Sequence, residues 1–275
     1  MKQRILVYVL CLSLFSAVSG GIAAAQREEY IALPVLMYHQ MTDRKGAEEK
    51  YIVSTDTFKA DLTYLRSEGY ESITLRELLA WYAGEGELPD KPVLITFDDG
   101  YESTLIHAGP LLREYGFTAV VAVIGSVADR YSESPDHNLD YSHLSWEAVR
   151  EMSEGDIFEI QCHSYDLHSL DGRRGCAPKK WEKEWAYHAV LQRDLQTFLN
   201  RCRQYDVNCV MSIAFPFGSY TKSTLEAVKA LGFQAAFTCE EKINHLTGDG
   251  EELYQICRFN RPGGVSTEEF FEKWK

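Results

Sequence analysis

Residues 92–100 read PVLITFDDG, and this segment gives the clearest indication of the fold. Its first six residues are almost entirely apolar and lack the alternation of a strand that has one face in water. Such a run is typical of a strand buried on both faces, as in a parallel sheet covered by helices. An Asp-Asp-Gly sequence follows at once, so polar side chains begin where the strand should end.

Similar runs recur along the chain and predict further strands. The strand-like segments are residues 34–40, 92–99, 117–125, 156–164, 212–218, 233–239 and 254–260. Apolar residues at helical spacing fill the gaps, as in 56–67, 103–115 and 178–205, and Pro110 should kink or split the second of these. This alternation predicts an α/β fold, a distorted (β/α)7 barrel with parallel strands, and an open doubly wound sheet is the alternative.

The start of the chain carries a targeting pattern. Two basic residues precede an uncharged apolar run over 5–25 that ends in small residues. This is typical of a signal peptide over 1–25, and an N-terminal membrane anchor is the alternative. We expect one domain over 26–275, with its core motifs within 92–275. The protein should be a secreted or cell-surface monomer that contacts a membrane only through the N-terminal segment.

The charge of the chain argues against one class of partner. The formal net charge is −13 at pH 7. A protein that binds duplex nucleic acid needs clustered lysine and arginine to neutralise phosphates. We therefore expect no nucleic-acid partner.

Polar side chains lie at the carboxyl ends of several predicted strands. In a parallel barrel the carboxyl ends of the strands meet at one rim, where chemistry gathers. His39, Asp98, Asp99 and His163 would all lie there. His163 and His168 are five positions apart, which on a helix would separate their directions by roughly 140°. One histidine on a strand tip and the other on the following loop have no such restriction, so they can converge.

Two histidines and one carboxylate form a familiar metal-binding set. Such a set holds Zn²⁺, Fe²⁺ or a similar ion and leaves positions open for water and substrate. Adjacent residues point in different directions, so one aspartate of the pair can be a ligand while the other accepts a proton from water. Asp-Gly is also a common turn dipeptide, and loop histidines are often merely polar. The joint occurrence of both motifs at strand ends favours the metal site.

The motifs TFDDGY (96–101), HSYDLH (163–168) and FPFG (215–218) resemble those of the polysaccharide deacetylases, carbohydrate esterase family 4, which carry the NodB-type homology domain. The resemblance covers roughly residues 34–274. It is greatest to the poly-β-1,6-N-acetylglucosamine deacetylase subgroup, which shares a "YH" strand like PVLMYHQ (34–40). It implies a (β/α)7-type barrel and a metal-dependent hydrolase that removes N-acetyl groups from an aminosugar polysaccharide. Poly-N-acetylglucosamine, peptidoglycan and chitin-like polymers are all candidate substrates.

The resemblance also implies roles for individual residues. Asp98 matches the catalytic base, and His39 matches the general acid of the subgroup. Phe217 lies in the motif that contributes a backbone N–H to the oxyanion. The ligands of a divalent metal ion, zinc first with iron, nickel or cobalt as alternatives, are matched by Asp99, His163 and His168.

Three more residues are candidates for the site. Arg258, in the last predicted strand, should orient Asp98 through an ion pair, and a purely structural salt bridge is the alternative. Tyr38 and Tyr101 should line the sugar groove, and core packing is the alternative for both.

Two departures from the family pattern leave other functions open. Ala214 stands where many members have an arginine, and the run QICRFNRPGG (255–264) lacks the histidine that many members use as the acid. His39 is therefore the candidate acid. The alternatives are a non-catalytic carbohydrate-binding relative and an O-acetyl esterase on acetylated glycans. A glycosidase with two carboxylates is a further rival, but it leaves both histidines unexplained.

Overall fold

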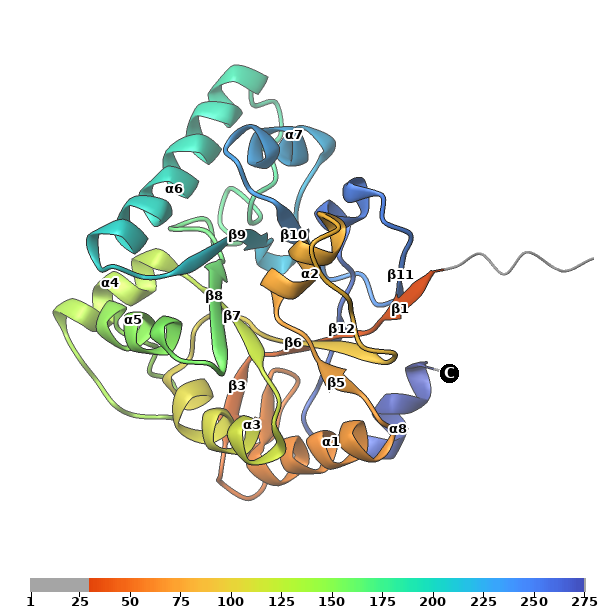
Figure 1. The fold of residues 1–275 in the computed structure, drawn as a ribbon. Coiled ribbons are helices and arrows are strands. Elements are labelled where there is room, and N and C mark those ends of the chain that lie inside the picture. The colour runs from red at the N-terminus through yellow and green to blue at the C-terminus, as the bar shows by residue number, and fades with distance from the viewer. Residues whose placement is uncertain (1–29, 275) are drawn as a thin grey trace, which may run out of the picture.

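The computed structural model describes residues 30–274. Its main sheet contains β2 (Val35–Tyr38), β5 (Glu71–Ser72), β6 (Pro92–Phe97), β7 (Ala119–Val123), β8 (Phe158–Cys162), β9 (Cys209–Ala214), β10 (Ala235–Phe237) and β12 (Phe259–Asn260). The strand order is β10-β9-β8-β7-β6-β2-β12, every pair is parallel, and β5 pairs with β6. The sheet curls into an incomplete barrel with helices around it (Figure 1). The predicted barrel of parallel strands is confirmed.

The helices follow the strands in alternation. They are α1 (Thr55–Ser67), α2 (Leu75–Tyr82), α3 (Gly109–Tyr115), α4 (Gly125–Glu133), α5 (Trp146–Glu154), α6 (Glu184–Gln204), α7 (Lys222–Ala230) and α8 (Thr267–Phe271). Shorter helical turns are η1 (Thr104–Ala108), η2 (Pro216–Gly218), η3 (Gly250–Gln255) and η4 (Glu272–Trp274). Within residues 30–274, no helix combines the length and the apolar character that crossing a membrane requires.

Two small sheets lie beside the barrel. In one, β1 (Ile31–Leu33) pairs with β11 (Asn244–Leu246) in antiparallel orientation. In the other, β3 (Gln40–Thr42) pairs with β4 (Ile52–Ser54) in parallel. The segment preceding β1 carries the predicted signal peptide or anchor, and residues 1–25 lie outside the described part of the chain.

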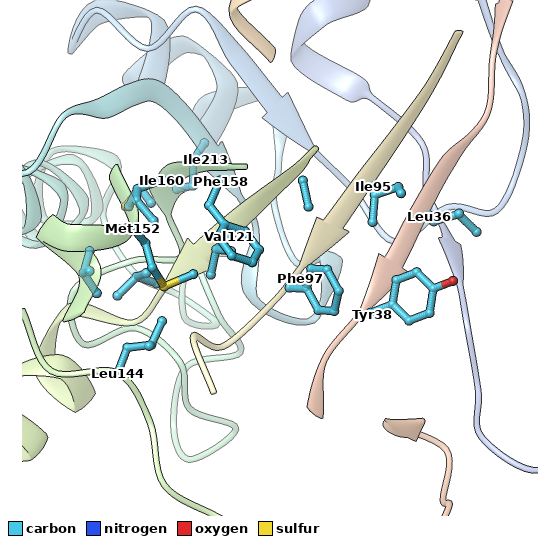
Figure 2. Close-up of a cluster of buried hydrophobic side chains, with 14 of the residues drawn as sticks. Leu36, Tyr38, Ile95, Phe97, Val121, Leu144, Met152, Phe158, Ile160 and Ile213 are labelled. Carbon is cyan, nitrogen blue, oxygen red and sulfur yellow. The ribbon is translucent and has the colours of Figure 1, made fainter. Parts of the chain in front are cut away.

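The barrel strands are buried on both faces, which explains their continuous apolar runs. One face packs against the surrounding helices through side chains such as Leu36, Ile95, Phe97, Val121 and Ile160, all fully buried (Figure 2). The opposite face forms a second apolar cluster, to which Val35, Leu94, Val120, Ala214 and Phe237 belong. Burying each large apolar side chain contributes about 1.5–3 kcal/mol, so alternation would have weakened this sheet.

The prediction of a strand over 254–260 is largely wrong. Residues 250–255 form η3, and strand geometry is limited to Phe259–Asn260. The reason is that the segment changes its partner strand, from β10 at Ile256 to β2 at Phe259 and Asn260. The Ile256 N–H donates to the Ala236 carbonyl at 3.0 Å, and the Thr238 N–H donates to the Ile256 carbonyl at 2.8 Å. This segment therefore bonds to the β10 edge before the chain reaches β2.

Pro110 lies at a distortion of the helix predicted over 103–115. A π-helical turn, η1, ends at Ala108, and α3 begins at Gly109. The backbone stays helical through this junction, where the Gly109 N–H donates to the Thr104 carbonyl. A wider turn of this kind accommodates a proline, which has no N–H to donate. The helix predicted over 178–205 is α6, which begins later, at Glu184.

Candidate metal centre and catalytic cavity

Three turns at the carboxyl ends of β6, β8 and β9 shape the site. Asp99 after β6, Ser164 after β8 and Phe217 after β9 have left-handed φ values of 70°, 66° and 58°. Such values are uncommon outside glycine and gather at functional sites. Gly100, at φ 73°, continues the first turn, and a Cβ there would stand 3.5 Å from the Val123 backbone. These turns aim side chains from separate strands at one point above the barrel.

Asp99, His163 and His168 meet at that point. The Asp99 Oδ1 atom lies 3.3 Å from His163 Nε2 and 3.3 Å from His168 Nε2. One ligand atom from each residue lies within 4.8 Å of the other two. Asp99 Oδ1 is buried and has no hydrogen-bond partner. A carboxylate oxygen and two imidazole nitrogens that face one another without a shared proton fit a divalent cation, and this N₂O donor set suits zinc, iron, nickel or cobalt.

A hydrogen bond sets the tautomer of His163. Its Nδ1 lies 2.8 Å from the Ala214 carbonyl oxygen. A carbonyl can only accept, so Nδ1 carries a proton, and Nε2, which faces Asp99, is the nitrogen left to bind a cation. Ala214 ends β9, so its backbone orients a ligand although its side chain is apolar.

The loop between the two histidines is held from both sides. Asp194 on α6 accepts hydrogen bonds from the Tyr165 N–H at 2.8 Å and the Asp166 N–H at 2.7 Å. At the start of α4, the Gly125 N–H donates to the Ser164 carbonyl at 3.1 Å. Burial raises the pKa of Asp194 to about 6, although its two backbone donors oppose that rise. The five-residue spacing is thus a short, clamped loop and not a helical turn.

Asp98 points away from this donor set and pairs with Arg258. Arg258 Nη1 donates to Asp98 Oδ1 at 2.7 Å and Nη2 donates to Oδ2 at 2.9 Å, with both side chains buried. Burial alone would raise the pKa of Asp98, but the charge of Arg258, with contributions from His163 and His39, lowers it below the usual range. The expected ion pair is present, and Asp98 is ionised at neutral pH.

His39 lies in the same cavity. Its Nδ1 atom is buried without a hydrogen-bond partner, and its ring centroid is 4.7 Å from that of Tyr51. Burial lowers the pKa of His39, while Asp98 and Asp99 oppose the shift. A protonated imidazole in this position gives up its proton readily.

A cavity of about 540 Å³ contains most of the expected site residues. Its lining is Met37, His39, Lys50, Tyr51, Asp98, Asp99, Tyr101, His163, His168, Arg174, Phe217, Cys239, Glu241 and Asn260. Burial, with a smaller contribution from Asp99, raises the pKa of Tyr101 to about 12, so its hydroxyl is neutral. A larger cavity of about 640 Å³ lies between α2 and β11 and is lined by none of these residues.

The prediction that Tyr38 lines the sugar groove is wrong. Tyr38 is fully buried, and its hydroxyl donates to Asp61 Oδ2 at 2.8 Å. The tyrosine is the last residue of β2, and its side chain faces the helix side of the sheet, next to Phe97 (Figure 2). His39, one position later, points the other way because successive strand side chains alternate.

Sequence reasoning missed several residues of the cavity. Tyr51 contacts His39, and the Arg174 guanidinium carbon lies 5.9 Å from the Phe217 ring centroid. Beside the cavity, the ring centroid of His143 lies 4.3 Å from that of the lining residue Tyr101. These residues come from loops without a recognisable motif, so only the folded chain brings them together.

The fold and the site together define a class: a parallel-barrel hydrolase with a histidine–carboxylate donor set and an arginine-held aspartate at its rim. The comparisons agree with that class. The family model described as polysaccharide deacetylase matches residues 85–236. The chain belongs to the polysaccharide deacetylase family and is thus a hydrolase of carbon–nitrogen bonds other than peptide bonds.

Individual relatives are similar over most of their length. YxkH of Bacillus subtilis (strain 168) is 29% identical over 244 residues, which are 88% of this chain and 76% of YxkH. The poly-β-1,6-N-acetyl-D-glucosamine N-deacetylase of Staphylococcus aureus is 28% identical over 206 residues, which are 75% of this chain and 67% of the relative. The structure of IcaB from Ammonifex degensii is 26% identical, with a TM-score of 0.68, and the match covers 87% of this chain and 94% of IcaB.

Proposed function

We propose that the protein removes acetyl groups from N-acetylated aminosugars of a polysaccharide, in a metal-dependent reaction. Poly-N-acetylglucosamine is the first candidate substrate because a curated relative carries that specificity in its name. Peptidoglycan and chitin-like polymers are the alternatives. The observation that carries the proposal is that Asp98 and His39, a base and an acid, line one cavity with a His₂Asp donor set.

Asp99, His163 and His168 would hold the divalent ion. A bound cation of this kind lowers the pKa of water and polarises a carbonyl. The protein contributes a fixed geometry, because Ala214 orients His163 and Asp194 holds the loop that carries His168.

Asp98 is placed to accept a proton from the attacking water. Arg258 occupies one lone pair on each carboxylate oxygen, so a lone pair remains available for that proton. The lowered pKa of Asp98 keeps it ionised in the resting enzyme. The Phe217 backbone N–H is the candidate donor to the oxyanion that develops as the acetyl carbonyl is attacked.

His39 is placed to protonate the departing amine. An amine leaves poorly as an anion, so cleavage of the carbon–nitrogen bond needs an acid. His39 then replaces the C-terminal histidine that the chain lacks, and Tyr101 provides a neutral hydroxyl at the cavity wall. The products are acetate and a free aminosugar in the polymer.

We place this activity outside the cell or at its surface, where polysaccharides of this kind occur. The N-terminal targeting pattern supports that placement. Detection of the protein in the culture medium or on the cell surface is the expected result of fractionation.

Acetate release tests the function. The protein should release acetate from acetylated poly-N-acetylglucosamine, peptidoglycan or chitin oligomers, lose that activity on chelation, and regain it with added zinc, cobalt, nickel or iron. Release from ester substrates alone would identify an O-acetyl esterase instead. Activity that is unchanged after complete metal removal would contradict the proposed role of Asp99, His163 and His168.

A further inference from the structure

The loop that leaves His168 runs along the edge of the catalytic cavity. The Gly175 N–H donates to the Ser169 carbonyl at 3.1 Å, and a Cβ on Gly175 would stand 2.4 Å from the Pro216 carbonyl oxygen. The loop backbone is therefore pressed against the rim turn that carries Phe217. Arg174, one residue earlier, lines the cavity itself.

Beyond the rim, the loop forms a braced turn. The Glu182 N–H donates to the Lys179 carbonyl at 3.1 Å, and the Lys179 N–H donates to Glu182 Oε2 at 2.9 Å. Arg173, which is only 8% exposed, donates to Glu182 Oε1 at 2.6 Å and to the Ala177 carbonyl at 2.9 Å. This network makes the turn a defined structure tied to the residue next to Arg174.

The braced turn presents a tryptophan to solvent. Trp181 occupies the third position of the turn with a φ of 65°, where glycine is normally favoured. Its side chain is 90% exposed, and that of Trp185 in the first turn of α6 is 72% exposed. The Lys180 ammonium lies 5.5 Å from the centroid of the Trp181 ring, but this contact leaves the indole open to solvent. A left-handed, exposed tryptophan adds little to stability, and exposed apolar groups of this size mark interaction sites.

We infer that Trp181 and Trp185 form a tryptophan platform that binds sugar units of the polymeric substrate outside the catalytic cavity. This inference rests on the proposed function. The flat indole matches the apolar C–H face of a pyranose ring, and its N–H can bond a hydroxyl.

The position of the platform favours a sugar polymer over other occupants. Glu182, the neighbour of Trp181, is bonded to Arg173, and the next residue, Arg174, lines the cavity, so one polysaccharide can contact both. The charges around the platform are mixed, with Lys179, Lys180 and Lys183 beside Glu182 and Glu184, and binding of a neutral N-acetylated polymer does not depend on them. A membrane contact is accordingly an outcome of the test.

Binding that does not depend on turnover is the first test. Metal-stripped wild type and the Trp181→Ala/Trp185→Ala variant are compared for affinity to long poly-N-acetylglucosamine, peptidoglycan and chitin. The variant should bind its best polymer about tenfold more weakly. Ile106→Ala, which removes an exposed apolar side chain on η1, should bind like wild type. Equal affinities of wild type and the double variant for all three polymers would overturn the platform. So would tryptophan-dependent binding to phosphatidylglycerol vesicles with unchanged polymer binding.

Substrate length separates this inference from the proposed function. With the double variant, KM for the long polymer should rise about tenfold, while kcat and KM for the disaccharide stay at wild-type values. Wild type that releases no acetate from any length would refute the proposed function, and the binding comparison would still decide the platform.

Trp181→Gly distinguishes a binding role from a structural one. Glycine relieves the left-handed strain, so the melting temperature should stay the same or rise. Polymer affinity should nevertheless fall below that of wild type. A variant of equal or higher stability that keeps full polymer affinity would overturn the inference.

Discussion

Two buried arginine–aspartate pairs, whose arginines are three positions apart in the chain, have different roles. Arg258 pairs with Asp98 at the rim of the barrel, and Arg261 pairs with Asp61 of α1, with Nε to Oδ2 at 2.8 Å. Both arginines are fully buried. The first pair faces the catalytic cavity. The second cross-links α1, the end of β2 and the start of α8.

The pKa values of the two aspartates shift in opposite directions. Burial raises the pKa of Asp61, and Arg261, Thr267 and Tyr38 offset that only in part. Around Asp98, two histidines add to the charge of Arg258, and the pKa falls. Asp194 has no cation as a partner, and its pKa rises to about 6. The groups that surround a buried carboxylate, and not burial alone, thus decide whether it stays ionised and can act as a base.

Replacement of Asp98 should change activity more than replacement of Asp61, Asp194 or Tyr38, and it distinguishes the two ion pairs. Asp98→Asn should lower kcat by about 10³-fold because it removes the general base. Its metal content, measured on the purified protein, should stay at the wild-type level, since the three ligands remain. Turnover within tenfold of wild type would contradict the role of Asp98.

The matched change at the other pair should affect stability. Asp61→Asn leaves the buried Arg261 charge without its partner, which costs about 3–5 kcal/mol in the free energy of unfolding. Denaturant titration measures this loss. At a temperature where the variant is folded, its kcat should equal that of wild type, and a fall comparable to that of Asp98→Asn would mean that the two pairs do not differ in function.

A pH series extends the comparison to Asp194. Its folded pKa of about 6 exceeds the reference value of 3.8, so the folded state holds the proton more tightly. The stability from this group is complete below about pH 4 and is lost as the pH rises through 6, by about 3 kcal/mol in total. The free energy of unfolding of wild type should therefore fall relative to that of Asp194→Asn as the pH rises from about 4 to 7. Parallel pH profiles of the two proteins would refute the raised pKa of Asp194.

Asp194→Asn also tests the clamp on the ligand loop. An amide can accept from only one of the Tyr165 and Asp166 N–H groups and presents its NH₂ to the other. Metal affinity should fall by about 10–100-fold, measured by cobalt absorption in competition with a chelator. Asp56→Asn, an exposed change on α1, is the control and should bind metal like wild type.

The smallest effect concerns Tyr38. Tyr38→Phe removes one hydrogen bond to Asp61 and should lower the free energy of unfolding by about 1 kcal/mol. KM for the polysaccharide should not change, because the side chain is buried on the helix side of the sheet. A raised KM with unchanged stability would restore Tyr38 to the sugar groove.

Much of the fold and part of the site follow from local sequence. Continuous apolar runs such as residues 92–97 indicate strands that need cover on both faces, and these runs alternate with helical periodicity, so a parallel barrel was predictable. Because such strands run in the same direction, the residues that follow them must gather at one rim. The sequence therefore predicted that Asp98, Asp99 and His163 lie close together. The prediction of a strand over 254–260 was largely wrong because Ile256 bonds to β10, and the chain pairs with β2 only at Phe259 and Asn260.

Local sequence indicates which chemical groups stand at the rim: His39, Asp98, Asp99 and His163 after apolar runs, and His168 on the loop that follows His163. Their protonation and their surroundings depend on the folded chain. Folding places Tyr38 in the core and brings Asp194 of α6 to the loop that carries the metal ligands. Strand identity depends on a few successive residues, whereas the pKa and orientation of a side chain depend on charges and donors that arrive from anywhere in the chain.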